Sequence, residues 1–365
     1  MASSYRRIRD IDWLMVSVAL CICALGVLQI FSATHETRWE ASWWKQIVFI
    51  GVGLLLLWLI TTVDYHTLMA QVPIYYALAV GLLILVLLVG TSGGGARRWI
   101  PIFGGFHFQV SEFAKLVIIL LVARYLTNQK REHLEGVEIL KVLALIVVPM
   151  ALVMKEPDLG TALTYLPVLA MGVFLAGLRM QQFLVIGIVA VVVPLFAYHF
   201  VLHDYQRSRL HTFLNPELDP RGRGYQVIQS QIAVGSGGMW GRGVTQGTQT
   251  QGRFLPATHT DFIFAAFGEE HGFVGVSVVL ALYLLLLLQI VQSAQSAPDR
   301  AGMYICMGVA SLLLFHVLVN VGMVVGRMPV TGIPLPLMSY GGSNTISMFM
   351  MLGLVNNVRL RRFVS

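Results

Sequence analysis

The sequence FLPATHTDFIFAAFGEEHG, from Phe254 to Gly272, closes a long polar segment and opens an apolar helix. Asp261 lies at this boundary, directly before Phe262. Burying a carboxylate beside hydrocarbon is costly, so such an acid either caps a helix or takes part in chemistry. Thr260 or Asp261 fits the N-cap position, where a side-chain oxygen accepts backbone N–H bonds. A carboxylate held at a helix start is also well placed to take a proton from a substrate hydroxyl.

The composition of the whole chain indicates a membrane protein. Of its 365 residues, 56% are hydrophobic and only 12% are charged, and the mean hydropathy is +0.74. That much apolar surface needs lipid around it, which excludes an ordinary soluble protein. Cys21, Cys23 and Cys306 lie inside apolar runs, where cysteine behaves as a small hydrophobic residue and not as part of a disulfide framework.

Runs of roughly 17 to 25 apolar residues mark membrane-spanning helices. The sequence therefore predicts an all-α polytopic membrane protein, a single integral membrane domain over residues 1–365 with about ten transmembrane helices. The expected spans are 13–33, 43–62, 73–90, 111–127, 138–154, 159–178, 181–202, 262–294, 302–326 and 343–358. The eighth begins with a short turn and crosses the membrane from Phe273. A large extracytoplasmic loop, about 203–261, separates helices 7 and 8.

The distribution of basic residues predicts the orientation. An even number of spans puts both termini on one side, and the short loops on that side hold more Lys and Arg, so both termini are expected in the cytoplasm. The long outer loop carries several arginines, including Arg207 and Arg209. They suggest an anionic partner such as lipid phosphate or a diphosphate, although a solvated loop would also carry such charges. The spacing of apolar residues in 225–233 predicts a short amphipathic helix on the membrane surface. The glycines of 235–243 predict a flexible bend.

Two charged residues lie within the fourth span. Glu112 and Lys115 are three apart in FQVSEFAKLVIILLV, on one helix face. Facing lipid would be costly for both, so we expect them to point into a protein cavity and to pair. The alternative is that Ser111 and Glu112 start the helix while Lys115 extends to the membrane surface.

Two further stretches are expected near the same outer edge. KEPDLGTAL, from Lys155 to Leu163, puts Pro157 and Asp158 at the outer end of the sixth span, where proline and an acid suit the first helical turn. Capping explains much of this pattern, but the cluster could also meet Asp261 across the bundle. PLPLMSYGGSN, ending at Asn344, predicts a rigid outer loop that runs into an N-cap at Ser343.

Five motifs then resemble a known family. FQVSEFAK, EPDLGTAL, GYQVIQSQIAVGSGGMWGRG, HTDFIFAAFGEEHG and PLPLMSYGGS have the order and spacing found in the SEDS family, the shape, elongation, division and sporulation proteins. The resemblance covers nearly the whole chain. HDYQRSRL at 203–210 and TQGTQTQ at 245–251 are more similar to the rod-shape branch than to the division branch.

This resemblance implies a peptidoglycan glycosyltransferase that polymerises lipid II into β-1,4 glycan strands during cell elongation. It implies a multi-pass protein of the bacterial cytoplasmic (inner) membrane, with its active site on the outer face. The implied partners are lipid II, undecaprenyl diphosphate, membrane lipids, the elongation machinery and a class B penicillin-binding protein with transpeptidase activity. No nucleic acid is expected.

The family's functional residues map onto this chain motif by motif. Its essential acid corresponds to Asp261, its buried acid and lysine to Glu112 and Lys115, and its Pro-Asp-Leu-Gly acid to Asp158. Where the family often has Arg, this chain has Lys45, which keeps the charge and loses the forked geometry. The remaining expected substrate contacts are Arg207, Arg209, His259, Thr260 and Ser343.

The chemistry implied by the resemblance needs only one base. An α-linked diphosphate donor gives a β-linked polymer by a single inverting displacement, whereas glycosidases use two carboxylates. Asp261 is expected to take the proton from the acceptor hydroxyl. Lys115, Arg207 and Arg209 are candidate partners of the leaving diphosphate, and a divalent cation, Mg²⁺ or Mn²⁺, at Asp261 or Glu112 is a candidate cofactor.

Two other functions also fit a membrane protein with these charges. A lipid II flippase would use them as a polar path for the headgroup, and a scaffold would only hold the transpeptidase. Glu112, Asp158 and Asp261 are all expected at the outer end, whereas a transporter should carry polar residues through to the cytoplasmic end of its spans. The sequence therefore favours the polymerase.

Overall fold

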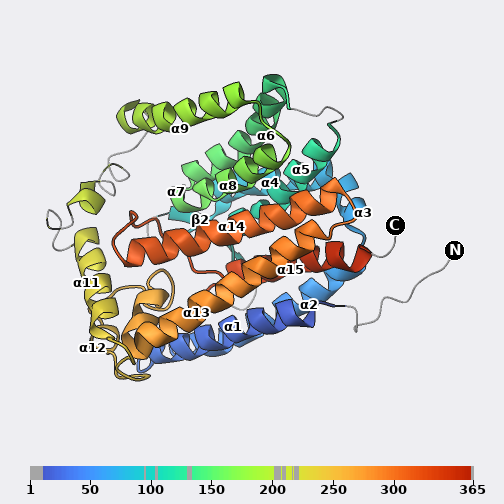
Figure 1. The fold of residues 1–365 in the computed structure, drawn as a ribbon. Helices are drawn as coiled ribbons and strands as arrows, with labels where there is room; N and C mark the ends of the chain where they lie inside the picture. Colours follow the sequence, from blue (N-terminus) through green and yellow to red (C-terminus); the bar gives the residue numbers. More distant parts are fainter. Residues whose placement is uncertain are drawn as a thin grey trace.

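The computed structural model of the chain describes residues 11–93, 96–102, 106–129, 134–200, 207, 211–215, 217 and 222–362. Most of this part of the chain is helical, and Figure 1 shows long helices packed side by side in one bundle. The long helices that match predicted spans are α1 (Trp13–Thr34), α2 (Ser42–Thr62), α4 (Val72–Val89), α5 (Val110–Thr127), α6 (Gly136–Lys155), α9 (Met180–Phe200), α13 (Ile263–Gln295), α14 (Arg300–Val324) and α15 (Gly342–Arg361). Each begins and ends close to its predicted span because apolar runs fix the length of a membrane helix.

Six of the described helices are long and apolar enough to cross a membrane by length and composition alone: α1, α2, α4, α6, α13 and α14. The other long helices include α5 and α15, which carry charges or many polar residues. The chain is thus an all-α, multi-pass membrane protein, and the expected total of ten spans stays a prediction.

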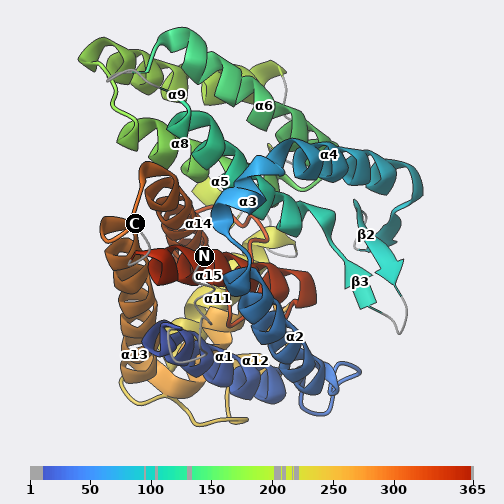
Figure 2. The same ribbon diagram turned by 90° about the vertical axis from the view of Figure 1, so that its right-hand side faces the viewer.

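Helices α14 and α15 form the core of the bundle. Most of their side chains are buried, including polar ones on α15 such as Asn344, Ser347 and Asn356. Figure 2 shows α15 in the middle, between α2 and α14, and it packs most extensively against α2. A helix with this many polar groups is stable in a membrane only where protein surrounds it, which explains its central position.

Helix α13 is bent at Gly272, whose φ of 63° is outside the helical range. The prediction of a short turn followed by a span from Phe273 is confirmed. Backbone bonds from Phe273 N to Gly238 O (2.8 Å) and from Gly243 N to Glu270 O (3.0 Å) hold the glycine segment against the bend. A Cβ on Gly241, whose φ is 82°, would lie 2.1 Å from Glu270 O. Gly237 and Gly241 are therefore needed for close backbone contact. The predicted bend is confirmed by the positive φ of Gly238, Gly241 and Gly243, and its flexibility stays a prediction.

The sixth predicted span is broken in two. It forms α7 (Leu159–Leu163) and α8 (Tyr165–Leu175), which meet at Thr164. A short helix, α3 (Tyr65–Ala70), also follows α2. The break at Thr164 was not predicted, because the sequence around it is continuously apolar. Helix α3 was not predicted, because six residues are too few to show a helical period.

A small antiparallel sheet follows α4 and was not predicted either. Its strands β1 (Thr91–Gly93), β2 (Ala96–Ile102) and β3 (Phe106–Phe108) pair in the order β1-β2-β3, with Thr91 opposite Trp99 and Ile100 opposite Phe108. Figure 2 shows β2 and β3 beside the end of α4, and β3 contacts α15. The sheet therefore leads the chain from α4 into α5 at the side of the core.

The described part of the long loop contains two helices, α11 (Arg223–Ser236) and α12 (Thr248–Gln251). The predicted amphipathic helix at 225–233 is confirmed as part of α11. It packs against α13 and α14, and in Figure 1 it runs across their ends. Ser230 Oγ donates to Val324 O at 2.9 Å, which fixes α11 to the end of α14.

Candidate active site

The ion pair between Glu112 and Lys115 lies in the interior of the bundle. Lys115 Nζ is 2.7 Å from Glu112 Oε1, and both side chains are about 97–98% buried. The prediction that the two residues pair inside the protein is confirmed, and the alternative in which Lys115 extends to the surface is wrong. A pair this deep needs further hydrogen bonds to offset the loss of water around two charges.

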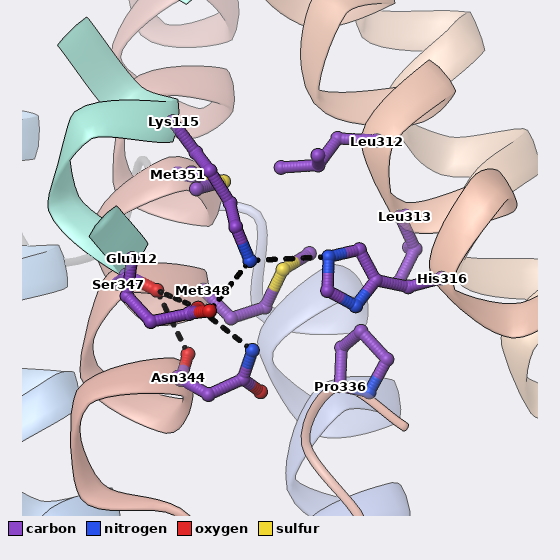
Figure 3. Close-up of a pocket in the computed structure, with 10 residues that line it drawn as sticks. All are labelled: Glu112, Lys115, Leu312, Leu313, His316, Pro336, Asn344, Ser347, Met348 and Met351. Carbon is purple, nitrogen blue, oxygen red and sulfur yellow. Dashed lines mark hydrogen bonds and ion pairs between the residues drawn. The ribbon is translucent and has the colours of Figure 1, made fainter. Parts of the chain in front are cut away.

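Side chains from α14 and α15 supply those bonds (Figure 3). Asn344 Nδ2 donates to Glu112 Oε2 at 2.9 Å, and Ser347 Oγ lies 3.5 Å from the same oxygen. Lys115 Nζ is 3.2 Å from His316 Nε2, while His316 Nδ1 is 3.1 Å from Pro334 O. This arrangement fits a neutral imidazole that carries its proton on Nδ1 and accepts from the ammonium. The cavity beside the pair measures about 10 Å³, room for about one water molecule, so no sugar fits there.

Asp261 is half-buried, where the long loop reaches α13. The N-cap residue of α13 is Phe262, without a side-chain capping bond, so the predicted N-cap at Thr260 or Asp261 is wrong. The backbone is held from elsewhere: Asn320 Nδ2 donates to Asp261 O at 3.0 Å and to Ile333 O at 2.8 Å. A Cβ on Gly332 would lie 3.6 Å from Asp261 Oδ2, so the carboxyl group is next to that glycine.

Helix α14 connects Asp261 to the buried pair. His316 and Asn320 are four residues apart, so they share one face of the helix. His316 contacts Lys115, and Asn320 holds the backbone at Asp261. Neither residue was predicted, although a histidine and an asparagine four apart inside an apolar run are a signal that the sequence carries.

Asp158 belongs to the same polar region. It is the N-cap of α7 and accepts from Thr161 N at 3.2 Å, so the capping interpretation is confirmed. Proline was expected in the first helical turn, but Pro157 precedes the N-cap residue Asp158, so that expectation is wrong. Gln109 Nε2 donates to Asp158 Oδ2 at 3.2 Å, and Arg98 Nη1 lies 3.6 Å from the same oxygen.

Ser343 is not the N-cap of α15, because Gly341 occupies that position. Instead, Ser343 Oγ accepts from Gln109 N at 3.0 Å. Gln109 therefore connects Asp158 with the start of α15, one residue before the Asn344 that contacts Glu112. Asp158 is thus linked through Gln109 to Ser343, which precedes the Asn344 that binds Glu112. The expected meeting of this charged cluster with Asp261 stays a prediction.

Glu156 was not predicted as a site residue. It lies between α6 and α7 and only 1% of its surface is exposed. Burial, reinforced by the charge of Asp158 and partly offset by Arg98, raises the pKa of Glu156 to about 8. The side chain therefore holds a proton at neutral pH.

Two of the basic residues expected to contact substrate, Lys45 and Arg207, lie outside the buried pair. Lys45 is exposed on α2, while its neighbour Gln46 is buried and donates to Thr345 Oγ1 at 2.8 Å. Arg207 Nη2 donates to His199 O at 2.8 Å, beside α9. Arg209 lies outside the described residues.

His259 and Thr260 are positioned by the loop before α15. Tyr340 N donates to His259 O at 2.9 Å, and Ser339 Oγ donates to Thr260 O at 2.7 Å. The His259 ring lies 5.8 Å from each of the Trp39 and Tyr340 rings, measured between centroids. Burial lowers the pKa of His259, so its imidazole is neutral at pH 7.

Of the two predicted cation ligands, Asp261 and Glu112, the structure disfavours Glu112. Within the described ranges, no three His, Cys, Asp or Glu side chains come together as a ligand set. Both carboxylate oxygens of Glu112 are engaged by protein donors, which removes it as a cation ligand. Mg²⁺ is commonly held by one or two carboxylates together with substrate phosphates, a role that one aspartate can fill.

Comparison with known proteins decides the family. The model of the FtsW, RodA and SpoVE family, described as "Cell cycle protein", matches residues 12–362. The chain belongs to this family. The resemblance to SEDS proteins drawn from the five motifs is therefore confirmed.

Individual relatives match over almost their full length. The Peptidoglycan glycosyltransferase MrdB of Escherichia coli (strain K12) is 37% identical over 356 residues, 96% of this chain and 94% of the relative. A structure titled "Structural coordination of polymerization and crosslinking by a peptidoglycan synthase complex" matches with a TM-score of 0.84 and 35% identity, over 97% of this chain and 99% of the other. The crystal structure of the rod shape determining protein RodA of Thermus thermophilus matches with a TM-score of 0.71 and 31% identity, over 97% and 98%.

Proposed function

We propose that this protein is a peptidoglycan glycosyltransferase that polymerises lipid II into β-1,4 glycan strands, with Asp261 as the general base. The observation that carries this proposal is the position of Asp261: the residue is half-buried, while the Asn320 side chain of α14 holds its backbone in place. A base must be held rigidly and still reach a substrate hydroxyl. The name of the Escherichia coli relative supports the same activity.

The reaction is a single displacement. Asp261 accepts the proton of the acceptor's N-acetylglucosamine 4-hydroxyl as that oxygen attacks the anomeric carbon of the donor's N-acetylmuramic acid. A new C–O bond forms on one face, the bond to undecaprenyl diphosphate breaks on the other, and the α configuration becomes β. One carboxylate suffices, because no second base or covalent intermediate is needed.

The leaving diphosphate carries negative charge that must be stabilised. If bound, a divalent cation would supply this neutralisation on the leaving-group side, opposite the face at which Asp261 takes the proton, with the donor's phosphate oxygens among its ligands. Lys115 does not contact the phosphates in this proposal, because its ammonium is bonded to Glu112 and His316 inside the bundle. It acts as a positioning residue that joins α5 to α14.

A class B penicillin-binding protein with transpeptidase activity is the proposed partner, in the elongation machinery of the cytoplasmic membrane. The similar synthase complex, whose title couples polymerization with crosslinking, supports this partner. With the termini in the cytoplasm, as the sequence predicts, Asp261 faces the outside.

The polar residues of α15 favour a polymerase over a flippase. Buried polar side chains occur at its start, from Ser343 to Ser347, and again at Asn356 and Asn357. Between them, Met348 to Val355 contains only apolar residues and a glycine, and the two asparagines are bonded to the ends of α1 and α2. A headgroup path through the bundle would need polar side chains along that interval.

Purified protein, combined with its transpeptidase partner and labelled lipid II in detergent, separates these functions. We expect glycan strands on a gel without any other polymerase. Detergent micelles offer no second leaflet, so a flippase makes no product there, and a scaffold makes none either. A complete lack of polymer from this folded complex would contradict the proposal.

A further inference from the structure

A second cavity, of about 200 Å³, opens beside the segment that carries Asp261. One wall is the connection between α1 and α2, with His35, Thr37 and Trp39, and the other is residues 250–259, with Gln251, Arg253 and His259. This cavity is therefore much larger than the space of about 10 Å³ beside the Glu112–Lys115 pair. It is smaller than the 300–1,000 Å³ typical of drug-sized ligands and suits a single ring.

Both walls are fixed by buried hydrogen bonds. Glu270 Oε1 accepts from Ser32 Oγ at 2.6 Å, and Gln251 Nε2 donates to Ser32 O at 3.0 Å. Thr245 N donates to Ser32 Oγ at 3.0 Å. The end of α1 is therefore tied to the segment before α13, so the cavity is built before any ligand arrives.

The lining combines an aromatic face with a polar rim. Trp39 is 46% exposed and lies 5.8 Å from the His259 ring. Arg253 Nη2 donates to Glu36 O at 2.8 Å across the mouth, and Arg253 keeps a positive φ of 57°, a conformation often retained at ligand clamps. A pyranose ring presents apolar C–H faces and a rim of hydroxyl groups, which match an exposed indole and surrounding hydrogen-bond groups.

Charge argues against a phosphate in this cavity. Arg253 is the guanidinium that lines it, and one of its nitrogens is already bonded to the Glu36 carbonyl. The His259 ring also lines the cavity. A diphosphate would need more free cationic donors than these residues supply.

The cavity is close to the proposed base. His259 lines it, and Asp261 is two residues further, at most about 7 Å away between Cα atoms. We propose that this cavity is a saccharide subsite, which holds an N-acetylated sugar of the glycan strand next to the sugar that reacts at Asp261. This inference deepens the proposed function and rests on it.

The test is binding of a neutral soluble probe, the N-acetylglucosamine tetramer, to the full-length Asp261→Asn protein in detergent by calorimetry. Because this variant lacks the proposed base, binding is measured independently of catalysis. We expect Trp39→Ala to weaken binding about tenfold and Trp39→Phe to restore most of it, since phenylalanine keeps an aromatic face. The matched control is Trp44→Ala, an exposed tryptophan of α2 outside the cavity, which should leave binding unchanged.

With Asp261 intact, Trp39→Ala should shift the product to shorter strands, and Trp44→Ala should not. Thermal unfolding of each variant confirms that it is folded. Absence of tetramer binding, equal effects of Trp39→Ala and Trp44→Ala, or displacement of the tetramer by inorganic pyrophosphate overturns the inference. Failure of the wild-type protein to polymerise lipid II would instead count against the proposed function. The tetramer-binding result would still show whether the cavity binds a saccharide.

Discussion

Removing the ammonium of Lys115 leaves the Glu112 carboxylate buried without its closest partner. Only the Asn344 bond at 2.9 Å and the longer Ser347 contact at 3.5 Å remain. Breaking one partner of a buried pair typically costs about 3–5 kcal/mol, and the surviving Asn344 bond favours the lower end of that range. We therefore expect Lys115→Met to lower the free energy of unfolding by about 3 kcal/mol.

The double variant Glu112→Gln with Lys115→Met removes both charges at once. Because no unpaired charge then stays buried, the free energy of unfolding should return to within about 1 kcal/mol of the wild type. Unfolding in mixed detergent micelles, followed for the wild type, both single variants and the double variant, gives the coupling energy of the pair.

The matched control is a pair with the same spacing whose lysine is exposed. Lys141 Nζ lies 2.8 Å from Glu138 Oε1, and 57% of the Lys141 side chain is exposed. Lys141→Met should change the free energy of unfolding by no more than about 0.5 kcal/mol, because water screens such pairs. Strictly additive losses at Glu112 and Lys115, or equal losses at Lys115 and Lys141, would refute the buried-pair reasoning.

Two further predictions concern stability. The pKa of Glu156 is raised from 4.5 to about 8 by burial and by Asp158, so the folded protein keeps a proton that the unfolded chain releases. The stability from this group is therefore complete below about pH 4.5 and falls as pH rises towards 8, and Glu156→Gln should flatten the pH dependence of the thermal midpoint. Gly241→Ala should lower the midpoint clearly, because the new methyl group would meet Glu270 O and φ is positive, whereas Gly81→Ala, with open space around it, should not. Thermal unfolding at several pH values tests the Glu156→Gln prediction. Thermal unfolding at a single pH tests the prediction for Gly241→Ala and Gly81→Ala.

The helices were predictable because their lengths are set by local composition. Residues 13–33, for example, are mostly apolar, and α1 spans Trp13–Thr34. The sheet at 91–108 was missed, because its strands are short and lie in a glycine-rich, charged stretch without a period of two. The break at Gly272 was expected only as a short turn before a span from Phe273, and its position agrees with that expectation.

The site was partly predictable, for a similar reason. The Glu112–Lys115 pair and the cap at Asp158 involve residues three apart on the chain, so a sequence pattern contains them. His316 contacts a residue 201 positions away along the chain, and Asn320 contacts one 59 positions away. No local sequence pattern specifies such contacts. The expected cap at Ser343 failed because its hydroxyl bonds a distant segment, where it accepts from Gln109 N. The Thr260 hydroxyl instead donates to Ala257 O, three residues back.

The central claim is that the Asp261 carboxylate removes the acceptor proton. The direct measurement is the polymerisation rate of labelled lipid II by the purified complex, comparing wild type with Asp261→Asn, which has nearly the same size and cannot act as a base. We predict loss of strand synthesis, with thermal unfolding and partner binding unchanged. Strand synthesis at the wild-type rate by the folded Asp261→Asn protein would contradict the account.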